Sequence, residues 1–149
     1  MKKKFLPLII VCSLLLMVRC GNNSSDNSNQ SDKKDTADKG IGKFKDIKLT
    51  HPLDEGMIGK GDGIFNAKCI ACHKLTDEKL VGPGFKGVSD KRTPEWIMNF
   101  ITNTNVMLDS DLVAQQLMVV CVSRMPNQNL SDDEARNMLE FIRKNDGKN

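Results

Sequence analysis

The sequence predicts an all-α domain of about four short helices, and three observations support this fold class. Apolar residues recur at helical spacing in four segments after residue 58, and two of these segments begin with helix-capping residues. A stretch rich in Gly and Pro, "LVGPGFKG" (residues 80–87, here the Gly-Pro loop), cannot continue as a long helix. No segment alternates convincingly between apolar and polar residues, as a half-buried strand would.

Two of the expected helices are indicated by apolar spacing alone. The first covers residues 59–75, "GKGDGIFNAKCIACHKL", in which Ile64, Phe65 and the run from Lys68 to Cys72 fall at helical spacing. The third covers residues 109–122, "DSDLVAQQLMVVCV". Its expected buried side chains are Leu112, Val113, Leu117 and Val120.

The second and fourth expected helices also carry start signals. The second covers residues 93–103, "TPEWIMNFITN", with Thr93 as the N-cap and Pro94 in the first turn. The fourth follows Ser131, an N-cap that forms a capping box with Glu134 three residues later. The apolar faces are expected to comprise Trp96, Ile97, Phe100 and Ile101 in the second helix, and Met138, Leu139, Phe141 and Ile142 in the fourth.

The amino end, residues 1–19, has the layout of a bacterial export signal. "MKKKF" is basic, and the apolar run "FLPLIIVCSLLLMV" is shorter than the roughly 18 residues of a membrane-spanning helix, so cleavage is expected rather than a retained anchor. Cys20 resembles the lipidated cysteine of bacterial lipoproteins, although Met17, Val18 and Arg19 depart from the usual residues before it. Ordinary cleavage, in which Cys20 has no role, is the alternative.

Residues 20–45 are expected to form the lipid-anchor cysteine and a flexible polar tether. The tract "GNNSSDNSNQSDKKDTADKGIG" offers almost nothing to bury. The folded domain is expected over residues 46–149, where 13 Lys and Arg stand against 15 Asp and Glu, a net charge of −2. The overall charge of +3 therefore resides at the amino end, and we expect no nucleic-acid partner.

The stretch "NAKCIACHKL" places Cys69, Cys72 and His73 within five positions of one another, which permits a metal site, a redox dithiol or covalent haem. Zinc needs four ligands, and the remaining candidates in the domain, Cys121 and His51, are not in a paired spacing. A thioredoxin-like dithiol would follow a strand in alternating βα units, which the sequence lacks. Both alternatives are therefore weaker than haem.

Covalent haem attachment fits both the residues and an exported protein. Cysteines three apart lie on one face of a helical turn, so both thiols can add to the vinyl groups along one edge of a porphyrin. We therefore expect one haem c, attached through Cys69 and Cys72, with His73 as an axial iron ligand. Cys121 is expected to be a buried, inert thiol, with an inter-chain disulfide or iron ligation as its alternatives. His51 is expected to be a surface histidine.

The second axial ligand decides the function, because a thioether sulfur gives an electron carrier rather than a gas-binding or oxygen-activating centre. Met125 is the expected ligand, since it lies in "SRMPNQNLSDDE", where Pro126 prevents an ordinary helix and the sulfur can project from a loop. Met107 and Met118 are the main alternatives. The methionines that fit core packing on amphipathic helices are Met98, Met118 and Met138.

Four segments, "GIFNAKCIACH", "VGPGFKGV", "PEWIMNFI" and "MPNQNLSDDEARNMLEFIR", occur in an order that resembles the small mono-haem class I cytochromes c, from about Pro52 to Asn145. The resemblance implies a cytochrome c fold, all-α, with its helices wrapped around one covalently attached haem c. It also implies that the first and last helices cross where Gly61 meets Phe141, with Phe65 nearby.

The resemblance further implies roles for three residues around the cofactor. The carbonyl of Pro83 is expected to accept a hydrogen bond from His73, which fixes the imidazole and its basicity. Trp96 and Arg92 are candidates for contacts with the haem propionates. Trp96 has core packing as its alternative role.

Together, these expectations predict that the protein is an electron carrier and not an enzyme, and that it has no small-molecule substrate. The expected partners are a membrane quinol-oxidising complex and a terminal oxidase or periplasmic reductase, which dock transiently with a lipid-anchored protein on the periplasmic side. A haem-based sensor or a peroxidase would need an open sixth position, and a dihaem peroxidase would also need a second Cys-x-x-Cys-His motif, which the sequence lacks. A fixed subunit of a larger oxidoreductase is the other alternative.

Overall fold

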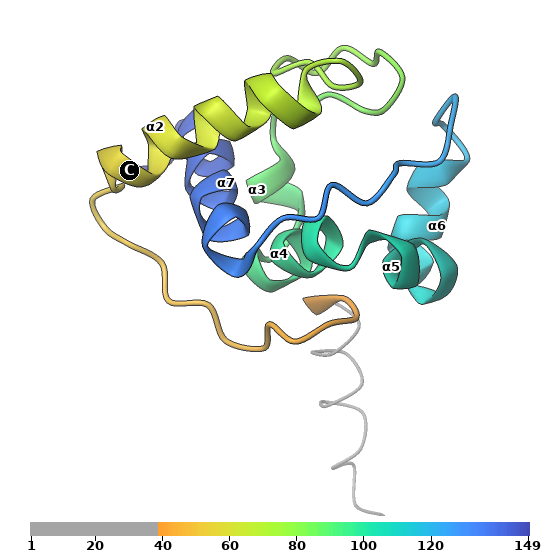
Figure 1. Ribbon diagram of the computed structural model, residues 1–149, viewed down its shortest axis with the longest axis horizontal. Coiled ribbons are helices and arrows are strands. Elements are labelled where there is room, and N and C mark those ends of the chain that lie inside the picture. The colour runs from red at the N-terminus through yellow and green to blue at the C-terminus, as the bar shows by residue number, and fades with distance from the viewer. Residues whose placement is uncertain (1–38) are drawn as a thin grey trace, which may run out of the picture.

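The computed structural model describes residues 39–149, and all regular secondary structure within this range is helical. The expected export signal and Cys20 lie outside the described residues. The helices of Figure 1 are α2 (Glu55–Ile64), the π-helical turn η1 (Phe65–Cys69), α3 (Val88–Lys91), α4 (Pro94–Thr102), α5 (Thr104–Ser110), α6 (Leu112–Met118) and α7 (Asp132–Asn145). The predicted all-α fold class is confirmed. Among residues 39–149, no helix combines the length and apolar character needed to cross a membrane.

The crossing of α2 and α7 organises the domain, and Gly61 makes it possible (Figure 1). A Cβ atom at Gly61 would lie 2.4 Å from the carbonyl oxygen of Asn137 and 2.5 Å from Cβ of Phe141. The two backbones therefore approach as closely as a side-chain-free residue allows. Phe65, at the end of α2, packs against Phe141 with ring centroids 5.6 Å apart. The expected meeting of Gly61 and Phe141 is confirmed.

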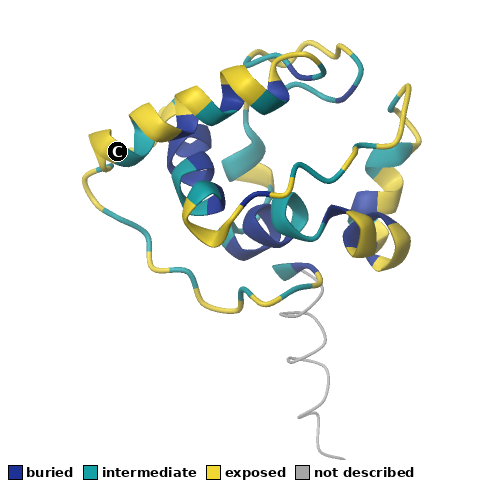
Figure 2. Cartoon of the chain, in the orientation of Figure 1, coloured by how far each residue is buried: buried dark blue, intermediate teal, exposed yellow. Residues whose placement is uncertain are grey.

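Helix starts follow the capping signals of the sequence. Thr93 Oγ1 accepts a hydrogen bond from Trp96 N at the start of α4. At the start of α7, Glu134 N donates to Ser131 Oγ and Ser131 N donates to Glu134 Oε2, which completes the capping box. The inner faces of α4 and α7 form the buried centre of the domain, as the dark blue ribbon of Figure 2 shows.

Two expected helices differ from the observed ones. The helix expected over residues 59–75 begins earlier, at Glu55, and ends in the turn η1. The helix expected over residues 109–122 stops at Met118, so the prediction that Leu112 and Val120 are buried is wrong: they are 74% and 52% exposed. With the shorter helix, those side chains face outward. The preceding helix, α5, was not among the helices expected from the sequence.

The extended N-terminal strap, residues 39–47, packs on α4 and α5 without forming a strand. The Asn99 side chain is fully buried; its Nδ2 donates to the carbonyls of Lys39 and Phe44, and its Oδ1 accepts from Phe44 N. Ile41 N donates to Met107 Sδ at 3.0 Å. The part of the expected tether from residue 39 onwards therefore belongs to the folded domain, because side chains of α4 and α5 satisfy its backbone.

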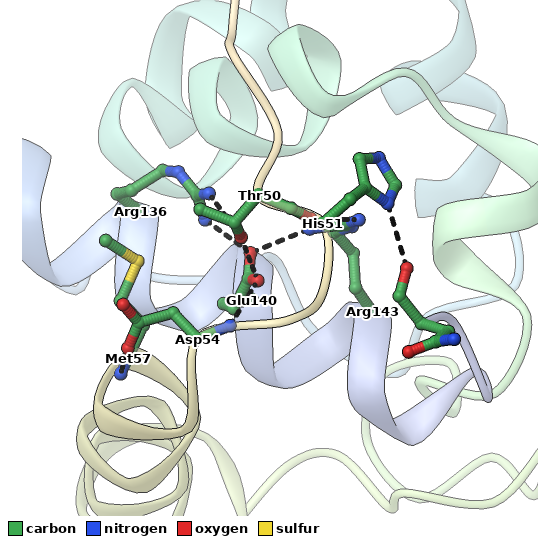
Figure 3. Close-up of polar contacts among 8 residues, drawn as sticks. Thr50, His51, Asp54, Met57, Arg136, Glu140 and Arg143 are labelled. Atoms are coloured by element: carbon green, nitrogen blue, oxygen red, sulfur yellow. Dashed lines mark hydrogen bonds and ion pairs between the residues drawn. The ribbon is translucent and has the colours of Figure 1, made fainter.

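A buried ionic network joins α7 to the start of α2 (Figure 3). Glu140 is fully buried and forms ion pairs with Arg136 at 2.7 Å and Arg143 at 2.9 Å. It also accepts hydrogen bonds from Thr50 Oγ1 and from the backbone N–H of Asp54, the N-cap of α2. Burial alone would raise the pKa of Glu140, but the bonds from Thr50, Arg136 and Asp54 lower it to about 2. Glu140 is therefore ionised and holds the first turn of α2 in place.

Candidate functional site

One cleft of about 280 Å³ brings together the site residues expected from the sequence. Its walls come from the end of η1, the Gly-Pro loop, α4, α6 and the Met125 loop (residues 119–130), which has no helix or strand. Phe100 and Ile101, expected in the core, are half-buried because they face this cleft. The expected site residues that line it are Cys69, Cys72, His73, Pro83, Arg92, Trp96 and Met125.

The two cysteines of the motif line the cleft and are not joined to each other by a disulfide. Cys69 is the last residue of η1 and is buried, whereas Cys72 is half-buried in the turn that follows. Cys72 N and His73 N both donate to the carbonyl of Cys69, at 3.0 and 2.9 Å, which keeps the motif in one compact turn. Burial raises the pKa of the Cys69 thiol, while the nearby Lys68 lowers it by a smaller amount.

His73 is 8% exposed and presents one defined ring nitrogen to the cleft. Its Nδ1 lies 2.8 Å from the carbonyl oxygen of Pro83. Because a carbonyl only accepts hydrogen bonds, Nδ1 carries the proton and Nε2 keeps a lone pair for a metal ion. Phe85 packs against the imidazole with centroids 4.9 Å apart. Phe85 was missed by the sequence analysis, although its place in the Gly-Pro loop was a usable signal.

The structure reduces the choice of a second sulfur ligand to two methionines. Met98, Met107 and Met138 are at most 2% exposed in the core and do not line the cleft. Met107 in addition accepts the backbone N–H of Ile41. Within residues 39–149, the methionines that line the cleft are Met118 and Met125.

Met125 is positioned by a loop that is tied at both ends. Arg124 Nη2 donates to the carbonyl of Asn105 at 3.1 Å and pairs with Asp109 at 2.8 Å, which connects the loop to α5. Lys68 Nζ donates to the carbonyl of Gln128 at 3.4 Å, which connects it to η1. The loop also turns back through Asn129, whose φ of 50° lies in the left-handed region that Asn tolerates. Met125 is half-buried between these two attachments.

Trp96 and Arg92 both line the cleft, but the indole N–H of Trp96 already has a hydrogen-bond partner. Trp96 Nε1 donates to Asp111 Oδ1 at 3.3 Å, and the indole stacks on Phe100 with centroids 5.0 Å apart. Because indole has a single N–H, Asp111 occupies that donor in this structure, and a contact of Trp96 with a propionate stays a prediction. The guanidinium of Arg92 lies over the Trp96 ring at 5.2 Å. Asp111, which also caps α6 through Ala114 N, carried no signal in the sequence for this contact.

The lining suits a flat, largely apolar group that bears carboxylates. Apolar side chains of α4 and α6 form much of the wall, and the two thiols and His73 stand together on one side. The charged residues of the lining are all basic: Lys68, Lys86, Lys91, Arg92 and Arg124. Haem has an apolar macrocycle, two vinyl groups for thiols and two carboxylates, so the residues present fit haem c.

Two further expectations about single residues have mixed outcomes. Cys121 is half-buried, lines the cleft and has its Sγ 3.1 Å from the carbonyl of Leu117, so the expectation of a buried thiol is wrong. The shortened α6 explains this, because Cys121 lies beyond its end. His51 is exposed, as expected. The described part of the chain contains no group of three His, Cys, Asp or Glu residues able to hold a metal ion by themselves.

Comparisons with known proteins agree with this site. The family model for cytochrome c matches residues 58–146. A cytochrome c from Rhodothermus marinus is 34% identical in sequence, with 71% of this chain and 90% of that chain covered and a TM-score of 0.68. An engineered form of a cytochrome c from that organism is 33% identical, with 72% and 92% covered and a TM-score of 0.67. The same engineered cytochrome bound to a carbene intermediate is 34% identical, with 72% and 92% covered and a TM-score of 0.65. Comparison with curated proteins gave no match.

Proposed function

Because the chain belongs to the cytochrome c family and carries covalently bound haem c, we propose that it is an electron carrier whose iron is ligated by His73 and Met125. The haem supplies an iron centre that accepts and releases one electron at a time. The sequence has one Cys-x-x-Cys-His motif and therefore one attachment site, at Cys69 and Cys72. Cys69 and Cys72 would hold the haem through thioether bonds to its two vinyl groups, an addition that would consume no other reactant.

The observation that supports this proposal most is the arrangement of His73. Its Nδ1 is committed to the Pro83 carbonyl at 2.8 Å, so Nε2 is the ring nitrogen left to bind iron. The hydrogen bond fixes the ring and raises its basicity, as a carbonyl partner does for metal-bound histidines. A methionine sulfur in the same cleft, from Met125, completes the ligand pair and closes the sixth position.

Met125 is preferred to Met118 because of its surroundings. Both methionines pack against the hydrophobic core, but Met118 is the last residue of α6, so the helix sets the direction of its side chain. Met125 precedes Pro126 in a loop that Arg124 and Lys68 attach to α5 and η1, so its backbone is fixed while its sulfur remains free to bind. A closed pair of ligands keeps the iron's surroundings similar in both oxidation states, which suits outer-sphere electron transfer.

The location and partners follow from the amino end and from the family. We infer that residues 1–19 are an export signal and that Cys20 carries a lipid, which places the domain on the periplasmic side of a membrane. A quinol-oxidising complex as donor and a terminal oxidase or periplasmic reductase as acceptor fit an anchored carrier of this kind. Their docking is expected to be brief, with a small interface.

The ligation is tested by the absorption spectrum of the ferrous protein before and after carbon monoxide is added. Over the time in which an open iron site binds carbon monoxide, the wild-type spectrum is expected to stay unchanged. Met125→Ala is expected to bind carbon monoxide promptly and to lower the reduction potential by on the order of 0.1 V, because a thioether ligand raises it. Met118→Ala is the matched control and should behave as wild type.

Each other outcome identifies a different error. Prompt binding of carbon monoxide by the wild-type protein contradicts the carrier function and favours a haem-based sensor or an enzyme. An open site in Met118→Ala together with a closed one in Met125→Ala shows that the ligand is Met118. Co-purification with a larger oxidoreductase would replace the mobile carrier by a fixed subunit.

A further inference from the structure

We propose that Gly82 is a positioning residue for the iron ligand: the absence of a side chain there lets the Gly-Pro loop lie against the His73 imidazole and hold it at the rotation that reaches Pro83. The inference rests on the proposed ligation by His73 and extends it to a residue that does not touch the iron. It concerns the orientation of the His73 ring, because naming His73 as a ligand does not explain what fixes that orientation.

The contact between Gly82 and the ring is closer than any side chain permits. A Cβ atom at Gly82 would lie 2.5 Å from Cε1 of His73, 3.0 Å from Nδ1 and 3.1 Å from Nε2. Carbon atoms in contact are ordinarily about 3.5–4.0 Å apart. A methyl group at this position would therefore overlap the ring edge that carries both nitrogens, and one of the two groups would have to move.

Backbone conformation does not explain the glycine. Among the described residues, the glycines with positive φ are Gly40, Gly87 and Gly147, and Gly82 is not one of them. Its φ therefore lies outside the left-handed region that favours glycine. The requirement at Gly82 is therefore for space beside His73.

The loop cannot easily retreat from the ring. Val81 N and Gly82 N both donate to the carbonyl of Cys72, at 3.2 and 3.0 Å, immediately before His73 in the chain. On the other side of Pro83, a Cβ atom at Gly84 would lie 2.0 Å from the carbonyl oxygen of Thr76, so the loop is also packed tightly against that turn. The imidazole is consequently the part that yields when Gly82 gains a side chain.

Displacement of the ring changes its chemistry as a ligand. Rotation or tilt lengthens the 2.8 Å contact between His73 Nδ1 and the Pro83 carbonyl, and the weaker hydrogen bond makes the imidazole a poorer electron donor. A poorer donor stabilises the ferric state less, so the reduction potential becomes more positive. The Nδ1 proton, no longer held by the carbonyl, also exchanges faster with solvent.

The experiment compares Gly82→Ala with wild-type holoprotein, using Gly59→Ala and Gly63→Ala as controls. A Cβ at either control position would meet no heavy atom within 4 Å. The readouts are the deuterium exchange rate of the His73 Nδ1 proton, followed by NMR of the ferrous protein, and the reduction potential. Gly82→Ala is expected to speed this exchange at least about tenfold and to shift the potential positively, and the controls are expected to change neither.

A merely structural role gives a different result. If Gly82→Ala lowers the melting temperature but keeps the wild-type exchange rate and potential, the proposal is wrong. If Gly82→Ala accumulates too poorly, Gly82→Ala with Phe85→Leu gives the ring more room and carries the same test, with Phe85→Leu alone as its control. The wild-type protein supplies an independent check, because a His73 Nδ1 proton that exchanges as fast as an exposed imidazole overturns the proposal by itself.

The failure of the proposed function would be recognised separately. In the wild-type ferrous protein, NMR resonances of the His73 ring should carry the shifts of an iron-bound imidazole. If they do not, the ligation by His73 is wrong and this inference falls with it. If the resonances do carry those shifts and only the Gly82 comparison fails, then His73 is an iron ligand but Gly82 has no positioning role.

Discussion

The two sides of the cleft are held by different kinds of contact. On the His73 side, backbone hydrogen bonds hold the Gly-Pro loop in place. Val81 N and Gly82 N donate to the Cys72 carbonyl, and Phe85 N donates to the Lys74 carbonyl at 2.8 Å. On the Met125 side, the loop relies largely on the side chains of Arg124 and Lys68. One backbone bond, from Val122 N to Val81 O at 3.1 Å, joins the two sides directly.

This difference between the two sides predicts which of the two proposed iron ligands is displaced more easily. Backbone hydrogen bonds hold a ligand residue in place without immobilising long side chains. Exposed ion pairs add little free energy to the folded state, because fixing the side chains costs entropy and solvent screens the charges. His73 is also 8% exposed, whereas Val119 and Val122 of the Met125 loop are 85% and 74% exposed. Opening of the iron site should therefore begin with Met125.

The largest effect is expected at Glu140, which does not line the cleft. Glu140→Ala leaves Arg136 and Arg143 without their shared carboxylate and removes the acceptor for Asp54 N at the start of α2. Loss of one partner from a buried ion pair costs about 3–5 kcal/mol of unfolding free energy. Urea unfolding measures it, with Glu78→Ala, which removes an exposed partner of Lys74, as a control close to wild type. A loss no larger than the control's would show that the network is not needed.

The same carboxylate gives the domain a defined response to acid. The folded-state pKa of Glu140 is about 2, below its ordinary value of 4.5, so its stabilisation is present above pH 4.5 and is lost as the pH falls towards 2. The slope contributed by this one group reaches about 1.4 kcal/mol per pH unit. Glu140→Gln should flatten the acid part of the curve of urea midpoint against pH. An unchanged curve would assign the acid sensitivity to other groups.

An intermediate effect is expected where α2 crosses α7. Gly61→Ala places a methyl group 2.4 Å from the Asn137 carbonyl oxygen, and such overpacking costs about 1–3 kcal/mol of unfolding free energy. Gly63→Ala, in the same helix with open space around it, should instead stabilise by roughly 0.5–1 kcal/mol. Thermal unfolding of the two variants side by side measures the difference. Equal melting temperatures would mean that the helices can separate at no cost.

The smallest effect on stability, with a selective effect on the iron, is expected at Arg124. Arg124→Ala removes its contacts with Asp109 and with the Asn105 carbonyl, and an exposed pair of this kind contributes about 0–1 kcal/mol. Because the loop loses its attachment to α5, slow entry of carbon monoxide at the ferrous iron should become several-fold faster. Lys43→Ala breaks a comparably exposed pair with Asp132 and should leave this rate unchanged. Identical rates in the two variants would contradict the role assigned to Arg124.

The sequence predicted the features that depend on neighbouring residues. The caps at Thr93 and Ser131 and the spacing of the cysteine motif are local signals, because each involves residues a few positions apart. The family resemblance added the contact of Gly61 with Phe141, which no local pattern contains.

Features that depend on distant contacts were missed. Trp96 was expected to meet a propionate or to pack in the core, and the sequence did not indicate its partner Asp111, the N-cap of α6, which lies fifteen residues away. Residues 39–45 of the strap were assigned to the tether because their few apolar residues gave no periodic signal, and the acceptor of the Phe44 N–H, Asn99, lies 55 residues further along the chain. Helix α5 was missed because seven residues are too short for a convincing apolar stripe.

The strap also determines where mechanical load enters the domain. A pull on the chain ahead of Lys39 first acts on the hydrogen bonds from Asn99 and on the contact between Ile41 N and Met107. These bonds are made to α4 and α5, so the force reaches the helix that carries Trp96 and the wall of the cleft. The crossing of α2 with α7 is loaded only after the strap has peeled away.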